Sequence, residues 1–254
     1  MSRQTPSNIY WHKGHIGRGD RERLNGHRGF TLWFTGLPAS GKSTMAVAVE
    51  KALHRRGCRT YILDGDNIRH GLNKDLGFSS RDREENIRRI GEVANLFRDC
   101  GVINLVAFIS PYRSDRRSAR DCSQNDGTFI EVFVDCPVEV CEARDPKGMY
   151  RKAREGTIKE FTGISAPYEV PQNPEIRICT HTQSVGQGVE AVLRYLFQHD
   201  LPFEDPVKDG EAIIGDPLPP IVRKAVRPDH RISSLKTHRL SIPKTASLLM
   251  GLVM

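Results

Sequence analysis

A glycine-rich segment near the start of the chain has the residue types and spacing of a phosphate-binding loop. Residues 36–44 read Gly-Leu-Pro-Ala-Ser-Gly-Lys-Ser-Thr and match G-x-x-x-x-G-K-[ST]. In such a P-loop the glycines let backbone N–H groups converge on an anion, and the helix that follows adds a favourable dipole. We expect Lys42 to reach the β- and γ-phosphates and the Ser43 hydroxyl to ligate Mg²⁺. The pattern predicts a nucleoside triphosphate site and leaves the phosphate acceptor open.

The whole loop is assigned to ATP: Gly36, Leu37, Pro38, Ala39, Ser40, Gly41, Lys42, Ser43 and Thr44. A GTPase would need a guanine-reading Asn-Lys-x-Asp sequence. Residues 73–76 read Asn-Lys-Asp-Leu and lack the final Asp. A metabolic kinase therefore fits better than a GTPase.

Two carboxylates follow the second predicted strand. Asp64 and Asp66 are two residues apart, so they point the same way if the strand pleat continues through them. We expect one to support Mg²⁺ and the other to accept the proton of an attacking hydroxyl. The sequence Asp-Gly-Asp-Asn also suits a plain turn, and that alternative stays open.

Cations gather in two later segments. Phosphoryl transfer depends on charge neutralisation, so a ring of cations is expected around the phosphates. The segment 144–154 follows a predicted helix and is dense in Lys and Arg, which favours a lid that closes over phosphates. A solvated helix face and an exposed basic loop are the plain alternatives. The arginines of the first segment are Arg69, Arg81, Arg83, Arg88 and Arg89.

Strands alternate with helices along the chain, and they must position these groups. The apolar β-rich runs are 30–35, 60–63, 102–109, 129–134 and 176–179. The predicted helices are 43–56, 80–99, 113–122, 138–144 and 185–198. This order predicts an α/β fold of the P-loop NTPase type, with three layers (α/β/α) and a mostly parallel sheet. Ligands of such sheets bind at the carboxyl ends of the strands.

The chain divides into three parts by composition. Residues 1–28 are polar, with a charged stretch over 18–28, and we expect an N-terminal arm or a short helix that leads into the core. Residues 29–201 form the P-loop domain. Residues 202–254 are rich in proline and basic residues, and we expect an extended or disordered tail.

Composition sets the expected partners and compartment. The net charge of +7 suits anionic partners of several kinds. A nucleic-acid partner is not expected, because the tail has no aromatic platform. The six cysteines form no CxxC pair, which favours free thiols in a reducing cytosol. The first residues lack a signal-peptide core and no apolar run could span a bilayer, so we expect a cytoplasmic protein without membrane contact.

Beyond these patterns, the chain closely resembles the adenylylsulfate kinase (APS kinase) family of sulfate assimilation over about residues 9–200. The matching segments are 9–12, 23–27, 36–44, 64–72, 76–79, 82–92, 109–113, 144–148, 161–164, 167–169 and 173–175. The resemblance implies transfer of the γ-phosphate of ATP to the 3′-hydroxyl of adenosine 5′-phosphosulfate (APS), with Mg²⁺ as cofactor. The products are 3′-phosphoadenosine 5′-phosphosulfate (PAPS) and ADP. It also implies a homodimer.

The resemblance implies roles for individual residues. Phe78 and Phe161 look like the aromatic pair that sandwiches the adenine of APS. Asp66 looks like the group that orients or deprotonates the 3′-hydroxyl, with Asp64 beside the metal. The catalytic set is Lys42, Asp66 and Ser110, the metal ligands are Ser43 and Asp64, and the APS contacts are Asp66, Arg69, Phe78, Arg83, Asn86, Ile109, Ser110, Lys147 and Phe161.

Ser110 matches a residue that is often described as a phosphoserine in this family. We favour direct in-line transfer, with Ser110 as a positioning group, because a P-loop site can align donor and acceptor without a covalent intermediate.

Some residues depart from the family pattern, and other functions compete. Pro38-Ala39 stands where many members carry Ser-Gly, and Ser165 stands where Asp is usual. We expect Ser165 to loosen a hydrogen bond near Phe161. The alternatives are another small-molecule P-loop kinase, or a non-catalytic nucleotide-binding regulator.

Overall fold

The computed structural model describes residues 8–10, 12, 14–123 and 126–199. Five strands form one parallel sheet in the order β2-β3-β1-β4-β5. They are β1 (Thr31–Thr35), β2 (Thr60–Asp64), β3 (Ile103–Ala107), β4 (Phe129–Asp135) and β5 (Ile176–Cys179). The predicted tail, 202–254, lies outside the described residues.

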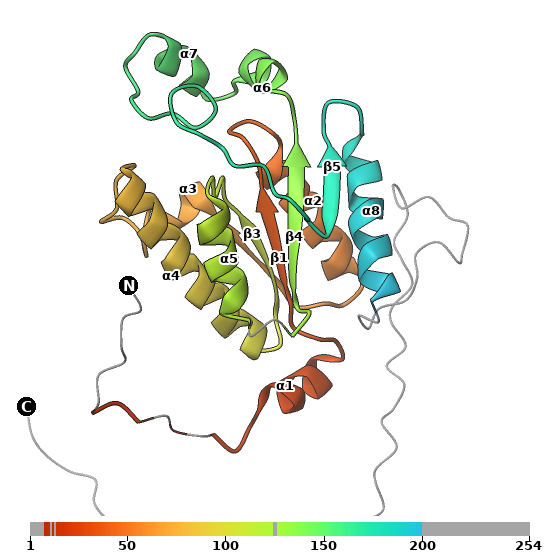
Figure 1. The fold of residues 1–254 in the computed structure, drawn as a ribbon. Coiled ribbons are helices and arrows are strands. Elements are labelled where there is room, and N and C mark those ends of the chain that lie inside the picture. The colour runs from red at the N-terminus through yellow and green to blue at the C-terminus, as the bar shows by residue number, and fades with distance from the viewer. Residues whose placement is uncertain (1–7, 11, 13, 124–125, 200–254) are drawn as a thin grey trace, which may run out of the picture. The chain divides into compact units, whose positions relative to one another are not determined.

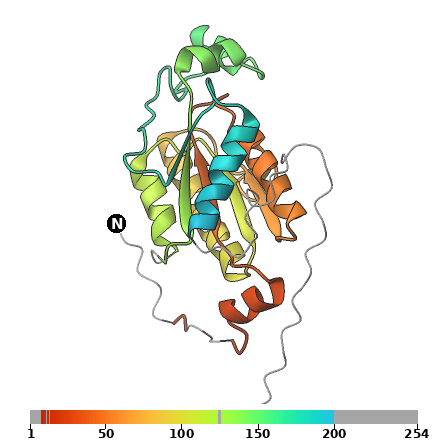
Figure 2. The ribbon, with the colours of Figure 1, turned by 90° about the vertical axis from the view of Figure 1, so that its right-hand side faces the viewer.

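Helices cover both faces of the sheet, which confirms the three-layer α/β/α prediction (Figures 1 and 2). The helices α2 (Lys42–Arg55) and α8 (Val185–Gln198) pack on one face, and α4 (Ser80–Asp99) and α5 (Arg113–Asp121) pack on the other. Four shorter helices complete the described chain: α1 (Arg18–Asn25), α3 (Gly65–Ile68), α6 (Val138–Arg144) and α7 (Met149–Arg154).

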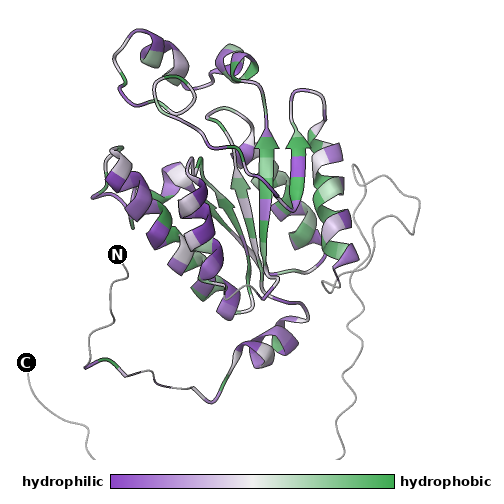
Figure 3. Ribbon diagram, viewed as in Figure 1, coloured by the Kyte–Doolittle hydropathy of each residue, from purple (hydrophilic) through white to green (hydrophobic). Residues whose placement is uncertain are grey.

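The first strand shows why the sheet needs two helical layers. Leu32 and Phe34 enter the core beneath α2 and α8, whereas Trp33 enters the core beneath α4 and α5. Successive residues of a strand point to opposite faces, so an apolar run is buried only when both faces are covered. Figure 3 shows apolar strands between helices whose outer faces are polar.

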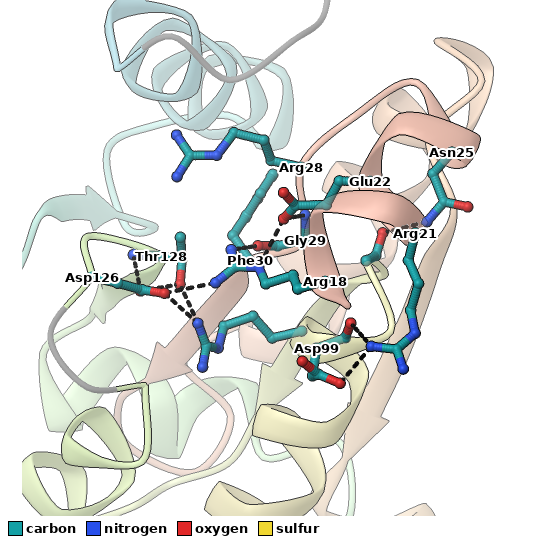
Figure 4. A network of polar contacts seen from close by, with 12 residues as sticks. Arg18, Arg21, Glu22, Asn25, Arg28, Gly29, Phe30, Asp99, Asp126 and Thr128 are labelled. Carbon is teal, nitrogen blue, oxygen red and sulfur yellow. Dashed lines mark hydrogen bonds and ion pairs between the residues drawn. The ribbon is translucent and has the colours of Figure 1, made fainter. Parts of the chain in front are cut away.

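The strand ends set the position of the site. All strands run the same way, so their carboxyl ends share one edge of the sheet, where α6 and α7 also lie (Figure 1). The helix α1 lies at the opposite, amino end. Two of its arginines form ion pairs with residues outside the helix. The guanidinium of Arg18 lies 2.6 Å from the carboxylate of Asp126, and that of Arg21 lies 2.7 Å from the carboxylate of Asp99 (Figure 4).

Most predicted element boundaries agree with the structure within two residues. The strand predicted over 102–109 ends at Ala107, which leaves Ile109 and Ser110 in the loop beyond it. In the described part of the chain no helix is both long and apolar enough to cross a membrane.

Candidate active site

The P-loop joins β1 to α2 at the carboxyl end of the sheet. Gly36 has φ 156°, and a Cβ there would lie 2.4 Å from the carbonyl oxygen of Val134. Gly41 has φ 101°, which suits a residue without a Cβ. Ala39 takes a left-handed φ of 58° with a side chain present, at a position where many APS kinases carry glycine. The loop therefore has the tight curvature that its sequence predicted.

Lys42 is buried beneath this loop. Its Nζ donates to the carbonyl oxygens of Gly36 at 3.0 Å and Leu37 at 2.7 Å. Burial lowers the pKa of Lys42 to about 8. The Oγ of Ser40 is also buried in the loop and makes no hydrogen bond within the described residues.

Ser43 and Asp64 lie together, as the predicted metal ligands should. The hydroxyl of Ser43 donates to Oδ2 of Asp64 at 2.7 Å. A hydroxyl and a carboxylate are hard oxygen donors of the kind that Mg²⁺ prefers. The residues present therefore fit a magnesium ion.

The strand pleat does not continue through Asp64 and Asp66. The chain leaves β2 at Asp64 and turns into α3, whose N-cap is Asp64. Oδ1 of Asp64 accepts from the backbone N–H of Asp66 at 3.0 Å, so the two carboxylates occupy a strand end and a helix start. The chain therefore turns at Asp64, which agrees with the alternative that the sequence Asp-Gly-Asp-Asn suits a turn. The side chain of Asp66 forms an ion pair with Lys147.

The segment predicted as a lid lies over the same edge and contains α7. Lys147 reaches Asp66 from it, and Arg144 donates to the carbonyl oxygen of Thr180 at 2.7 Å. Oγ1 of Thr180 in turn donates to the P-loop carbonyl of Ser40 at 2.7 Å. The lid segment thus contacts both the P-loop side and the α3 side of the site.

Phe78 and Phe161 lie in different surroundings. Phe78 is 64% exposed, and the guanidinium of Arg69 lies 4.4 Å from its ring centroid. Phe161 is 7% exposed, and its ring packs edge-on against Tyr150 with the centroids 4.9 Å apart. Arg83 joins the two segments, because it donates to the Phe78 carbonyl at 2.9 Å and to Thr162 Oγ1 at 2.7 Å.

Ser165 makes a hydrogen bond at the position where it departs from the family pattern. Its hydroxyl accepts a hydrogen bond from the backbone N–H of Phe161 at 3.0 Å. A serine oxygen in this turn can serve as acceptor in place of a carboxylate, so a local bond to the Phe161 backbone is present.

Ser110 is buried with a left-handed φ of 39°. Its Oγ accepts from Trp33 Nε1 at 3.1 Å, and its carbonyl accepts from Arg116 at 2.7 Å. Arg116 is itself paired with Glu131 at 2.7 Å. The neighbouring Ile109 carbonyl accepts from Thr35 at 2.7 Å, and that hydroxyl also contacts Tyr168.

Asn86 lies on α4 and is buried. Its Oδ1 accepts from Asn73 Nδ2 at 2.7 Å, which leaves the amide N–H groups of Asn86 to donate elsewhere. Sequence reasoning did not single out Asn73, Arg116 or Tyr150. Tyr150 acts on Pro38, 112 residues away, while Arg116 and Asn73 act on Ser110 and Asn86, 6 and 13 residues away, at spacings that no motif reports.

Two of the clustered arginines serve the helix surface instead. Arg88 and Arg89 both bind Glu85, at 2.8 and 2.9 Å, and Arg89 also binds Asp75. These bonds match the alternative of a solvated helix face.

Four other cations around the site donate only to neutral oxygens. They are Lys42, Arg69, Arg83 and Arg144, and their acceptors are backbone carbonyls and threonine hydroxyls. None of the four forms an ion pair with a carboxylate of the described residues. The carboxyl end of the sheet therefore keeps positive charge that an anionic ligand can neutralise.

Comparison with known proteins agrees with this geometry. A model of the adenylylsulphate kinase family matches residues 28–179. The adenylyl-sulfate kinase of Geotalea daltonii is 60% identical over 74% of this chain and 93% of its own length. That of Staphylococcus haemolyticus is 58% identical over 75% of this chain and 95% of its own length.

Solved structures show the same likeness. The Mycobacterium tuberculosis APS kinase CysC in complex with AMPPNP and APS has a TM-score of 0.65 at 50% identity, over 67% of this chain and 98% of that one. A hexameric APS kinase from Thiobacillus denitrificans has a TM-score of 0.54 at 32% identity, over 71% of this chain and 32% of that one. Taken with the P-loop and the cations around it, these matches show that the chain belongs to the adenylylsulphate kinase family.

Proposed function

We propose that this chain transfers the γ-phosphate of ATP to the 3′-hydroxyl of APS, giving PAPS and ADP. The observation that carries the proposal is the group of four cations at the carboxyl end of the sheet that have no carboxylate partner in the described part of the chain. Two anionic nucleotides that meet head to tail need such a group. Membership of the family, and the related structure that holds AMPPNP and APS, support this choice of substrates.

The P-loop side would hold ATP. Lys42 already lies among the loop carbonyls, so it needs only to exchange those acceptors for phosphate oxygens. Mg²⁺ bound at Ser43 and Asp64 would supply further positive charge to the phosphate oxygens. The Ser40 hydroxyl lacks a partner in the loop and is free to donate to the same anion.

The α3 and α4 side would hold APS. Phe78 offers an exposed face on which a base can stack, and Asn86 presents amide donors that suit an anion. Arg69 and Arg83 hold the backbone around Phe78 and keep their charge for the phosphosulfate. Ser110 has its hydroxyl and its carbonyl already bonded, which suits the role of a positioning group.

Asp66 would orient or deprotonate the 3′-hydroxyl, but its carboxylate is paired with Lys147. Both side chains are 67% exposed, so this ion pair is weak and can exchange. An anionic substrate gives Lys147 an alternative partner and releases Asp66 toward the hydroxyl. Direct in-line transfer then needs no covalent intermediate.

Assembly as a homodimer and a cytoplasmic location stay predictions. One relative is described as hexameric, so the oligomeric state of this chain needs its own measurement. Analytical ultracentrifugation of the full chain would give it.

The test of the activity is a product assay. The purified protein is mixed with MgATP and APS, and nucleotides are separated by anion-exchange chromatography. We expect equimolar ADP and PAPS, and no such turnover with gluconate or adenosine as the acceptor. Equal ADP release with those acceptors would favour another small-molecule kinase, and binding of ATP without turnover would favour a regulator.

A further inference from the structure

The two proposed nucleotide sites share one small apolar cluster beneath the lid. Its buried members are Cys136, Cys141, Tyr150 and Phe161, and the P-loop residues Leu37 and Ala39 pack against it. The cluster is separate from the two larger cores on the faces of the sheet. Residues of the ATP side and the APS side therefore touch the same side chains.

Tyr150 lies at the centre of this cluster and is 1% exposed. Its hydroxyl donates to the P-loop carbonyl of Pro38 at 3.0 Å, across 112 residues of chain. Its ring meets the ring of Phe161 edge-on, with an interplanar angle of 78°. Burial raises the pKa of Tyr150, so the phenol keeps its proton and remains a donor.

The backbone of Tyr150 is fixed as well. The carboxylate of Asp145 accepts from the N–H groups of Tyr150 and Arg151, both at 3.1 Å. These bonds satisfy free donors in the first turn of α7. The ring of Tyr150 is therefore held from its backbone and from its hydroxyl.

A second contact brings the same two segments together. A Cβ at Gly163 would lie 2.9 Å from Cδ2 of Leu37, so the turn after Phe161 approaches the P-loop closely. Leu37 fills the space beside Gly163, and groups packed this closely shift together more readily than apart. A change in the P-loop is therefore felt at the segment that carries Phe161.

We propose that Tyr150 is a positioning residue that couples the two substrates. Tyr150 holds the Pro38 carbonyl and the ring of Phe161 in a fixed relation. When ATP binds the P-loop, this link favours the position of Phe161 that binds APS. The proposal rests on the proposed function, because it assigns the P-loop to ATP and Phe161 to APS.

The test uses Tyr150→Phe in the full chain, which removes the hydroxyl and keeps the ring. The Kd of APS is measured by calorimetry with and without the non-hydrolysable analogue AMPPNP. We expect AMPPNP to lower the Kd of APS for the wild type. In the variant, the ratio of the Kd without AMPPNP to the Kd with AMPPNP should be about fivefold smaller, the effect of one neutral hydrogen bond. Coupling is reciprocal, so the enhancement of AMPPNP binding by APS should fall by the same factor.

Tyr61→Phe is the matched control. Tyr61 is on β2, is half exposed and stacks on Phe97. The substitution removes the same hydroxyl group from a tyrosine outside the cluster. We expect its coupling factor to equal that of the wild type. A Tyr150→Phe variant with the wild-type factor, or a wild type without any enhancement, would overturn the proposal.

Phe161→Leu separates this proposal from the site assignment. Leucine keeps most of the buried volume and removes the aromatic ring. If APS affinity falls in Phe161→Leu while Tyr150→Phe keeps the wild-type coupling, the site assignment stands and the coupling role fails. If APS affinity is unchanged in Phe161→Leu, both the assignment of Phe161 and the coupling are wrong.

Discussion

The two ends of the sheet use arginine in opposite ways. At the amino end, Arg18 and Arg21 of α1 and Arg98 of α4 each bind a carboxylate, Asp126 or Asp99 (Figure 4). At the carboxyl end, four cations bind only carbonyl and hydroxyl oxygens. The residue types are similar, but the partner decides the role. Arg18, Arg21 and Arg98 attach helices through carboxylates, whereas the four cations at the carboxyl end have no carboxylate partner among the described residues and keep their charge for a ligand.

Arg116 shows that the division follows the partner and not the location. It lies near the carboxyl end, yet it pairs with Glu131 and is buried. Its remaining donors bind the carbonyl oxygens of Ser110 and Glu169. It therefore supports the site and has no charge to spare for a ligand.

The largest expected effect comes from Lys42→Ala at the carboxyl end. It removes a cation that has no carboxylate partner, so kcat should fall by about 10³-fold, as for a lost transition-state donor. The urea midpoint should change little, because loss of the two bonds to loop carbonyls is offset by removal of a buried charge. Steady-state kinetics with MgATP and APS would measure this. A near-normal kcat would show that Lys42 does not serve phosphate transfer, which contradicts the role given to the cations at the carboxyl end.

Phe78→Ala is expected to weaken APS binding by about tenfold or more, the value of one base stacked on an aromatic ring. Phe78 is exposed, so its loss should leave the thermal midpoint unchanged. Calorimetry with APS and, separately, with AMPPNP would distinguish the two nucleotides. Equal weakening of both would move Phe78 out of the APS site.

Arg18→Ala tests the amino end. Its side chain binds Glu22 at 2.8 Å, Asp126 at 2.6 Å and the Gly29 carbonyl at 2.7 Å. We expect the free energy of unfolding to fall by about 1–2 kcal/mol, because these partners are only partly exposed. Urea denaturation would measure it, with kcat as the control. A reduced kcat at unchanged stability would mean that α1 also serves the site.

A pH dependence is also expected from the amino end. His27 is buried, its Nε2 accepts from the N–H of Arg59 at 2.8 Å, and its Nδ1 lies 3.0 Å from the Arg28 carbonyl. This arrangement needs the neutral ring, and burial lowers the pKa of His27 below 6.5. The unfolded state then binds more protons, so the contribution of His27 is lost as pH falls from about 6.5.

The pH test compares urea unfolding at pH 7.5 and 5.5 for the wild type and His27→Gln. We expect the loss of unfolding free energy between these values to be smaller in the variant. An identical loss in both proteins would assign the pH dependence to other groups.

The smallest effect concerns the P-loop backbone. Ala39→Gly should raise the free energy of unfolding by up to about 1 kcal/mol, because glycine adopts a left-handed φ without the penalty of a Cβ. Urea denaturation of the two proteins would measure it. A destabilised variant would show that packing of the Ala39 methyl in the lid cluster outweighs the backbone strain.

The sequence predicted the fold well because its signals are local. The strand β5 and the helices α4, α6 and α8 begin and end at the predicted residues. Each is defined by its own apolar spacing or cap, and the P-loop is defined by its own glycines. The sequence left the pleat and the turn at Asp64 to Asp66 open, because nothing in it showed that the chain changes from strand to helix at Gly65.

The supports of the site could not be predicted in the same way. Tyr150 to Pro38, Arg83 to Thr162 and Trp33 to Ser110 join residues at least 77 positions apart. Such contacts depend on how whole elements pack, and a single sequence carries no spacing that reports them. The identity of the phosphate acceptor likewise came from the family resemblance and not from the P-loop.

The hydrogen bonds of Lys42 to its own loop have a consequence for selectivity. A ligand must displace both carbonyl acceptors, and a hydrogen bond from a charged ammonium is worth about 1.5–3 kcal/mol. A small ion such as inorganic phosphate recovers little more than it displaces, whereas a triphosphate also engages the loop amides and a metal. The loop therefore favours a triphosphate, which engages more groups than it displaces, over a small anion such as inorganic phosphate.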